Sequence, residues 1–84
     1  MLTVSVISPE RTLFEGEVDS VVAPAFDGEV GILTNHAPMM TLLGKGTLRL
    51  EGSAGRRFHV EGGFLQVADN QVRVVTEHAS AIEG

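Results

Sequence analysis

The chain has 84 residues, and its six Lys and Arg residues against eleven Asp and Glu residues give a net formal charge of −5 at pH 7. A chain of this length holds one small hydrophobic core, so residues 1–84 are expected to form a single domain. The excess of acidic residues argues against nucleic acid and anionic membrane surfaces as partners, because both bind clusters of Lys and Arg. The absence of cysteine excludes disulfides, thiolate catalysis and cysteine-based zinc sites.

The sequence predicts neither export nor insertion into a membrane. Residues 1–5 have no basic leader and no apolar stretch that ends in small residues, so they do not resemble a secretory signal. The longest apolar runs, 21–26 and 37–43, are far shorter than the roughly 20 residues that a membrane-spanning helix needs. Any association with a membrane is therefore expected to come through a partner.

From the N-terminus onward, apolar and polar residues alternate, which is the pattern of half-buried strands. No stretch of ten or more residues has the apolar spacing of a helix, and only residues 78–84 show a hint of one. In chain order, the pattern predicts strands over residues 2–6, 13–14, 18–23, 47–51, 57–61, 64–68 and 71–76.

Turn-forming residues separate these strands. Asp69-Asn70 is the sharpest signal, because both residue types tolerate positive φ and only these two residues divide two strand patterns, as in a tight hairpin. The result is predicted to be a meander of short hairpins. Further turns are expected at residues 8–11, 26–29, 44–46 and 51–55.

Short strands with one apolar face need a second layer to cover that face. We therefore predict an all-β fold in which two antiparallel sheets pack as a β-sandwich, with a flattened barrel as the alternative. Arg49 is expected to face solvent. The expected core residues are Leu48, Leu50, Phe58, Val60, Val67 and Val74.

No residue pattern in the sequence points to catalysis. The three histidines, His36, His59 and His78, lack the spacing of metal ligands, and residues 44–47 lack the glycine and the following helix of a phosphate loop. The serines have no nucleophile motif. The acidic residues Glu15, Glu17 and Asp19 are interpreted as a solvated sheet edge. A small β-barrel enzyme or ligand binder would need a polar pocket for which the sequence offers no candidate residues, and a generic β-sandwich adaptor is the third alternative.

Residues 27–40 stand apart from the strand pattern. Glycines on both sides of Glu29, followed by Asn35, Pro38 and two methionines, predict special backbone angles rather than a regular strand. Methionine-rich surfaces often serve protein contacts. This segment is therefore the candidate contact surface.

The chain resembles the epsilon subunit of the F-type ATP synthase over nearly its whole length. The resemblance implies a β-sandwich of two five-stranded sheets, about ten short strands in all. It is carried by Thr12-Leu13-Phe14-Glu15-Gly16-Glu17-Val18, Asp27-Gly28-Glu29-Val30-Gly31-Ile32-Leu33, His36-Ala37-Pro38, Gly46-Thr47-Leu48-Arg49-Leu50 and Gly62-Gly63-Phe64-Leu65-Gln66-Val67.

The resemblance also implies a function. In that family the domain binds the gamma subunit, rests on the polar loops of the c-ring and rotates with both in the central stalk, coupling proton flow to ATP synthesis without catalysis or a cofactor. It implies a peripheral position on the cytoplasmic face of the bacterial inner membrane, or the organellar equivalent. Family members usually continue into a helical hairpin that inhibits hydrolysis and in some binds ATP. The chain ends at Gly84, where that hairpin would begin, so neither feature is expected here.

Six partner-binding residues follow from the resemblance. Glu29 matches the residue that faces the c-ring loops, and Gly28 and Gly31 are expected to fold the backbone around it so that its carboxylate lies at a loop tip. The sequence has Glu61 where a small polar residue is frequent and Gln66 where Glu is frequent, with Asn35 at a usual glycine and no Pro before Gly46. The positions that match the gamma side are Ser8, His36, Thr41, Glu61 and Gln66.

Overall fold

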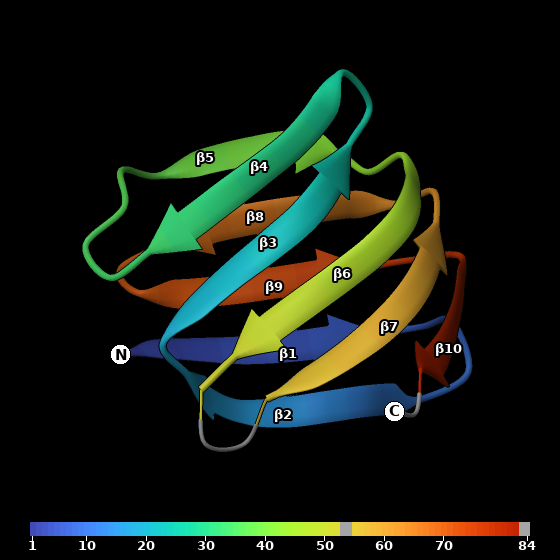
Figure 1. The fold of residues 1–84 in the computed structure, drawn as a ribbon, viewed down its shortest axis with the longest axis horizontal. Coiled ribbons are helices and arrows are strands. Elements are labelled where there is room, and N and C mark those ends of the chain that lie inside the picture. The colour runs from blue at the N-terminus through green and yellow to red at the C-terminus, as the bar shows by residue number, and fades with distance from the viewer. Residues whose placement is uncertain (53–54, 83–84) are drawn as a thin grey trace.

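The computed structural model of the protein describes residues 1–52 and 55–82, which form ten strands and no helix (Figure 1). The predicted all-β fold of about ten short strands is therefore confirmed. The strands are β1 (Leu2–Ile7), β2 (Thr12–Val18), β3 (Ser20–Ala25), β4 (Gly28–Leu33), β5 (Met39–Leu42), β6 (Lys45–Glu51), β7 (Arg56–Glu61), β8 (Phe64–Ala68), β9 (Gln71–Val75) and β10 (His78–Ile82).

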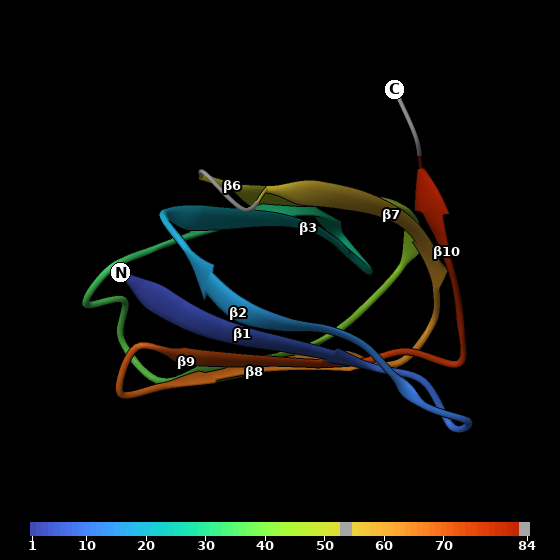
Figure 2. The same ribbon diagram turned by 90° about the horizontal axis from the view of Figure 1, so that it is seen from below.

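The strands form two five-stranded sheets that lie as two layers (Figure 2). The strand order is β2-β1-β9-β8-β5 in sheet A and β10-β7-β6-β3-β4 in sheet B. Two separate sheets confirm the β-sandwich rather than the flattened barrel. Each sheet turns one face inward, so the strands inside the sheets bury about every second side chain between the layers, whereas the edge strand β10 has no buried residue.

The core lies between the two sheets. All six core residues predicted from the sequence are buried, and Arg49 is exposed as expected. Leu50 is typical, with 2% of its surface exposed. The buried apolar residues are Leu2, Val4, Val6, Val18, Val21, Ala23, Ile32, Leu43, Leu48, Leu50, Phe58, Val60, Leu65, Val67, Val72 and Val74.

The predicted meander is wrong. Hairpins do join β1 to β2, β3 to β4, β6 to β7 and β8 to β9, but β1 also pairs with β9 in parallel, and the chain passes between the layers several times. The hint of a C-terminal helix is also wrong, because residues 78–82 form β10 on the edge of sheet B. A local pattern gives the period of a strand but not its partner, so both errors concern long-range pairing.

The turns follow the prediction in most places. Asp69 and Asn70 have φ values of 52° and 60° and make the two-residue hairpin between β8 and β9. The Ser8 hydroxyl donates to the Arg11 carbonyl at 3.1 Å, which closes the turn at residues 8–11. The expected turns at 26–29 and 44–46 are wrong in part, because β4 begins at Gly28 and β6 begins at Lys45. In the expected turn at 51–55, residues 53 and 54 lie outside the described residues.

Residues 28–33 form a strand, which corrects the expectation of an irregular backbone there, whereas positive φ values at Gly28 and Asn35 confirm special angles at two positions of residues 27–40. β4 pairs with β3 over six residues without a register shift, and the turn before it is Phe26-Asp27. Gly28 has a φ of 131°, whereas Gly31 has no positive φ. Glu29 is therefore the second residue of an edge strand and does not lie at a loop tip.

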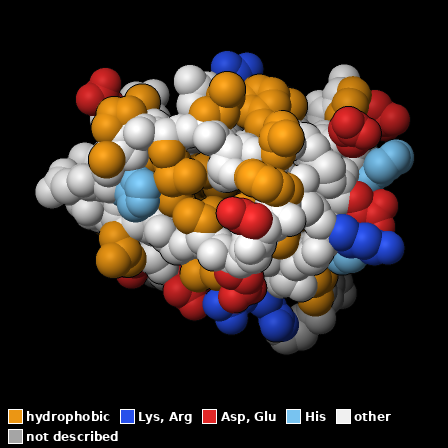
Figure 3. Space-filling view, turned by 90° about the horizontal axis from the view of Figure 1, so that it is seen from above, with side chains coloured by type: hydrophobic (Ala, Val, Ile, Leu, Met, Phe, Trp, Pro, Cys, Tyr) orange, Lys and Arg blue, Asp and Glu red, His pale blue; other side chains and the backbone are white. Residues whose placement is uncertain are grey.

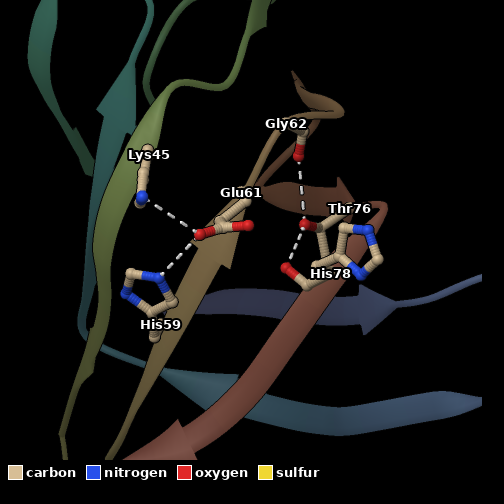
Figure 4. Close-up of polar contacts among 6 residues, drawn as sticks. All are labelled: Lys45, His59, Glu61, Gly62, Thr76 and His78. Atoms are coloured by element: carbon tan, nitrogen blue, oxygen red, sulfur yellow. Dashed lines mark hydrogen bonds and ion pairs between the residues drawn. The ribbon is translucent and has the colours of Figure 1, made fainter.

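The Gly62-Gly63 pair fits tightly against the end of β9. Gly62 and Gly63 have φ values of 73° and 105°, in the region that favours glycine. The Gly63 carbonyl accepts a hydrogen bond from the Leu43 amide at 2.9 Å, which ties the pair to the end of β5. The buried Thr76 hydroxyl lies 3.0 Å from the Gly62 carbonyl oxygen and 2.9 Å from the His78 carbonyl oxygen (Figure 4).

Replacing Thr76 with valine is expected to lower the free energy of unfolding by about 1–3 kcal/mol. The variant keeps the shape of the side chain but removes the one buried hydroxyl hydrogen that the Gly62 and His78 carbonyls share. Urea unfolding followed by circular dichroism measures the change. A Thr76→Val variant as stable as the parent would show that these carbonyls find another donor.

Candidate partner-binding surface

Large apolar side chains are exposed where the edge strands β4 and β5 lie on the same side of the sandwich. We name as the edge patch the four residues Phe26, Leu33, Met40 and Leu42, each between 63% and 69% exposed. Figure 3, which views this side of the molecule, shows hydrophobic side chains gathered on it. Apolar groups gathered in this way on a small domain typically mark a surface that another protein covers.

The local structure explains why these side chains face solvent. The Phe26 amide donates to the Leu42 carbonyl at 3.1 Å, and Ala25 pairs with Leu43 as an isolated bridge, so the β3–β4 turn contacts the end of β5. Within β5, Met39 packs against the core, whereas Met40 and Leu42 are exposed. The short β5 strand thus supplies apolar side chains to both of its faces.

An apolar row extends from the edge patch across the outer face of sheet A. Leu42 pairs with Phe64, Phe64 with Val75, and Val75 with Ile7, so the four side chains are neighbours on successive strands. Phe64, Val75 and Ile7 are half-buried. The edge patch and this apolar row form one continuous apolar surface through Leu42.

Three of the predicted gamma-side residues border this surface. Ser8 follows Ile7 directly, and Gln66 is exposed and pairs with Met40. Thr41 lies in β5 between the two exposed apolar residues and is itself half-buried.

His36 lies in the connection between β4 and β5, beside the edge patch. Its amide donates to the Leu33 carbonyl at 3.1 Å, and its Nδ1 lies 2.7 Å from the Ala37 carbonyl oxygen. The preceding Asn35 has a φ of 67°, and its amide donates to Oδ1 of Asn70 at 2.6 Å. Nδ2 of Asn70 donates back to Oδ1 of Asn35 at 3.2 Å. This reciprocal pair fixes the connection against the β8–β9 hairpin.

The two acidic candidates, Glu29 and Glu61, have different surroundings. Glu29 is exposed on the edge strand β4, next to the edge patch. Glu61 lies in β7 of sheet B, where Lys45 Nζ is 3.5 Å and His59 Nε2 is 3.4 Å from its Oε1 (Figure 4). The structure thus gathers five of the six predicted residues along the β4–β5 side and sheet A, and gives Glu61 partners within its own sheet.

The contacts of Glu61 predict a pH dependence. The hydrogen bond from His59, followed by the charge and hydrogen bond of Lys45, holds the pKa of Glu61 below its ordinary value of 4.5. This stabilisation is fully present above the unfolded pKa and is lost as the pH falls through the lower folded pKa. A Glu61→Gln variant is therefore expected to lose less stability than the parent when the melting temperature is followed from about pH 6 to about pH 3. High salt should reduce the difference, because these groups are exposed to solvent. Equal acid sensitivity of variant and parent would contradict this reading.

A shallow depression of about 300 Å³ is lined by His59, Glu61, His78, Ala79 and Ser80 on the outer side of β7 and β10. Within residues 1–52 and 55–82, no group of three His, Asp or Glu side chains is placed to hold a metal ion. No helix in that part of the chain could span a membrane.

The sequence pattern did not indicate Phe26 and Leu42 as surface residues, whereas Leu33 lies within residues 27–40, the candidate contact surface. Their exposure depends on the position of β4 and β5, which are edge strands of different sheets on the same side of the sandwich. A local sequence pattern does not show that arrangement. One signal was available. The run Met39-Met40-Thr41-Leu42-Leu43 has apolar residues on both faces of a strand, so one face had to lie outside the core unless another element covered it.

Comparison with known sequences shows close relatives along the whole chain. An ATP synthase epsilon chain from Leptospira borgpetersenii serovar Hardjo-bovis is 49% identical over 83 residues, which cover 98% of this chain and 65% of the relative. The chain thus spans just under two thirds of the length of that relative. An ATP synthase epsilon chain from Caulobacter vibrioides is 43% identical over 76 residues, which cover 89% of this chain and 88% of the relative.

Solved structures show the same fold. A chain of the Euglena gracilis mitochondrial ATP synthase, in an OSCP/F1/c-ring assembly, superposes with a TM-score of 0.87 at 23% identity, covering 95% of this chain and 52% of that chain. A chain of the central stalk and c-ring of the Tetrahymena thermophila mitochondrial ATP synthase superposes with a TM-score of 0.78 at 17% identity, covering 94% and 65%. Residues 1–82 match the family described as the β-sandwich domain of the ATP synthase delta/epsilon chain. The chain therefore belongs to the ATP synthase delta/epsilon family and has the β-sandwich domain of that family.

Proposed function

We propose that the chain is a non-catalytic rotor subunit of an F-type ATP synthase, located in the central stalk between the gamma subunit and the c-ring. It couples proton flow to ATP synthesis by transmitting rotation, and it is held at the cytoplasmic face of the membrane through the complex. The names of the relatives and the assemblies that contain the structural neighbours support this proposal. Residues 1–84 act as one domain in this role.

The continuous apolar surface of the edge patch and the apolar row is the observation that carries the proposal. A domain of 84 residues can form only a small hydrophobic core, so each large apolar side chain matters for its stability. Four such side chains nevertheless remain exposed to solvent on one side of the domain. Covering them removes apolar area from water, which favours association. We assign this surface to the gamma subunit, with Ser8, His36, Thr41 and Gln66 at its border.

Glu29 is assigned to the c-ring. It is the charged residue of β4, it is exposed, and it lies between Phe26 and Leu33, the edge-patch residues at the two ends of that strand. A carboxylate at the rim of an interface mainly sets encounter and orientation. Glu61 is the least suited of the six to contact gamma, because Lys45 and His59 already contact its carboxylate.

Binding of the purified chain to the purified gamma subunit tests the assignment. A Leu42→Ser variant is expected to bind gamma about five- to thirtyfold more weakly, since Leu42 joins the two parts of the apolar surface. The matched control is Ile82→Ser, which removes an exposed apolar side chain from β10 on the other sheet. Both variants should keep the parent melting temperature. Equal affinities for the parent and Leu42→Ser would overturn the assignment of this surface.

A further inference from the structure

The four edge strands of the sandwich differ in how they are protected. An edge strand carries unpaired backbone groups, and proteins usually shield them with charges, proline, shortness or a bulge. β2 carries Glu15 and Glu17, and β5 has only four residues and follows Pro38. β4 has six residues, one charge at Glu29 and no register shift against β3, and β10 has five residues, no Asp, Glu, Lys, Arg or Pro, and no register shift against β7. Of these two edges of sheet B, β4 is the one that continues directly into the edge patch.

The pairing of β4 with β3 shows which of its backbone groups point to the open side. Pro24 has no amide hydrogen, and its carbonyl accepts from the Gly44 amide at 2.7 Å, on the β6 side of β3. Pro24 pairs with Glu29, so this pair is not hydrogen-bonded, and the amide and carbonyl of Glu29 point away from β3. Because successive residues of a strand alternate in direction, the amide and carbonyl of Gly31 also point away from β3. The amides and carbonyls of Val30 and Ile32 instead form hydrogen bonds with β3.

The side chains around this edge leave room for a further strand. A side chain at Gly31 would meet no atom within 4 Å. Phe26 and Leu33 lie at the two ends of β4, and both are exposed. On the inner side, Val30 and Met39 pack against the core and are only partly buried, so part of their apolar surface stays accessible on this side of the sandwich.

We propose that β4 accepts an extended segment of the gamma subunit as a sixth strand of sheet B; this rests on the proposed function. Main-chain hydrogen bonds to Glu29 and Gly31 supply the register, as in other cases of strand addition. The segment has apolar residues at alternate positions, which cover Val30 and Met39, whereas the Glu29 side chain lies on the opposite face of β4 and stays available to the c-ring.

Amide hydrogen exchange of the chain, free and bound to purified gamma subunit, tests this strand addition without a mutation. In the free chain the amides of Glu29 and Gly31 are expected to exchange fast and those of Val30 and Ile32 slowly. On binding gamma, the amides of Glu29 and Gly31 should slow by about tenfold or more, because they gain a partner strand. If the complex forms and these two amides stay fast, strand addition is wrong while the proposed function stands. If no complex forms, the proposed function fails as well.

Two substitutions at one position separate the backbone contribution from the side chain. Gly31→Pro removes an amide hydrogen that points outward, which an edge strand tolerates, and should weaken gamma binding about tenfold or more. Gly31→Ala keeps that hydrogen and adds a methyl group in open space, so its affinity should stay within about threefold of the parent. A folded Gly31→Pro variant with parental affinity would overturn the proposal. If Gly31→Pro does not fold, the exchange rates of the parent decide.

Discussion

Replacing Gly63 with alanine is expected to unfold the chain. At the φ of 105° that Gly63 adopts, a side chain is strained by about 1–3 kcal/mol. The added Cβ would also overlap the Val75 carbonyl oxygen and lie 2.7 Å from the Thr76 Cα, and both are backbone atoms that a rotamer change does not move. A domain of this length has a total stability of about 4–12 kcal/mol, so a loss of about 4 kcal/mol or more leaves little folded protein.

Urea unfolding followed by far-ultraviolet circular dichroism measures this loss. Gly31→Ala is the matched control, because Gly31 has no positive φ and a side chain there meets nothing within 4 Å. The control should unfold at nearly the parental urea concentration. A Gly63→Ala variant that unfolds at the same urea concentration as the parent would show that the end of β9 can move away from residue 63.

Replacing Leu50 with alanine is expected to lower the free energy of unfolding by about 2–5 kcal/mol. Leu50 is 2% exposed and pairs with the buried Val21 on the neighbouring strand, so the smaller side chain leaves a cavity in the core. The neighbouring Arg49→Ala is the matched control, because Arg49 is exposed on the opposite face of β6. That change should stay within about 0.5 kcal/mol.

The same urea titration compares both variants with the parent. The prediction requires a large difference between two adjacent residues of one strand, which only the alternation of buried and exposed faces explains. Similar losses for Leu50→Ala and Arg49→Ala would contradict the position of Leu50 in the core.

The sequence predicted the parts of the fold that depend on local chemistry. Alternation along residues 47–51 and 57–61 identified Leu48, Leu50, Phe58 and Val60 as core residues, because the two faces of a strand see different environments. Asp69-Asn70 identified the β8–β9 hairpin, because few residues tolerate the positive φ that such a turn requires.

Long-range pairing could not be predicted in the same way. The parallel contact of β1 with β9 joins residues about 70 positions apart in the sequence. The residue pattern of neither strand indicates that the other is its pairing partner. Residues 78–82 contain two alanines and a serine, which fit a helix as well as a strand, and only pairing with β7 makes them a strand. Glu29 was expected at a loop tip because two glycines surround it, but Gly31 lies in the middle of a regular strand.

The candidate contact surface, too, could be predicted from local sequence only in part. The methionines of residues 39–40 indicated a contact surface, and the structure adds that Met40 and Leu42 join Phe26 and Leu33 across two sheet edges. The roles of Ser8, Glu29, His36, Thr41, Glu61 and Gln66 stay predictions, because each concerns a contact with another chain.

Co-purification tests the central claim most directly. The tagged chain is bound to an affinity resin together with the detergent-solubilised membranes of its own source cells, and the retained proteins are identified by mass spectrometry. The rotor assignment predicts that the parent and Ile82→Ser retain both the gamma subunit and the c-ring subunit, and that Leu42→Ser, altered in the proposed gamma surface, retains less of both. Recovery of neither subunit with the parent chain, from membranes in which both are detected, would contradict a place in the central stalk.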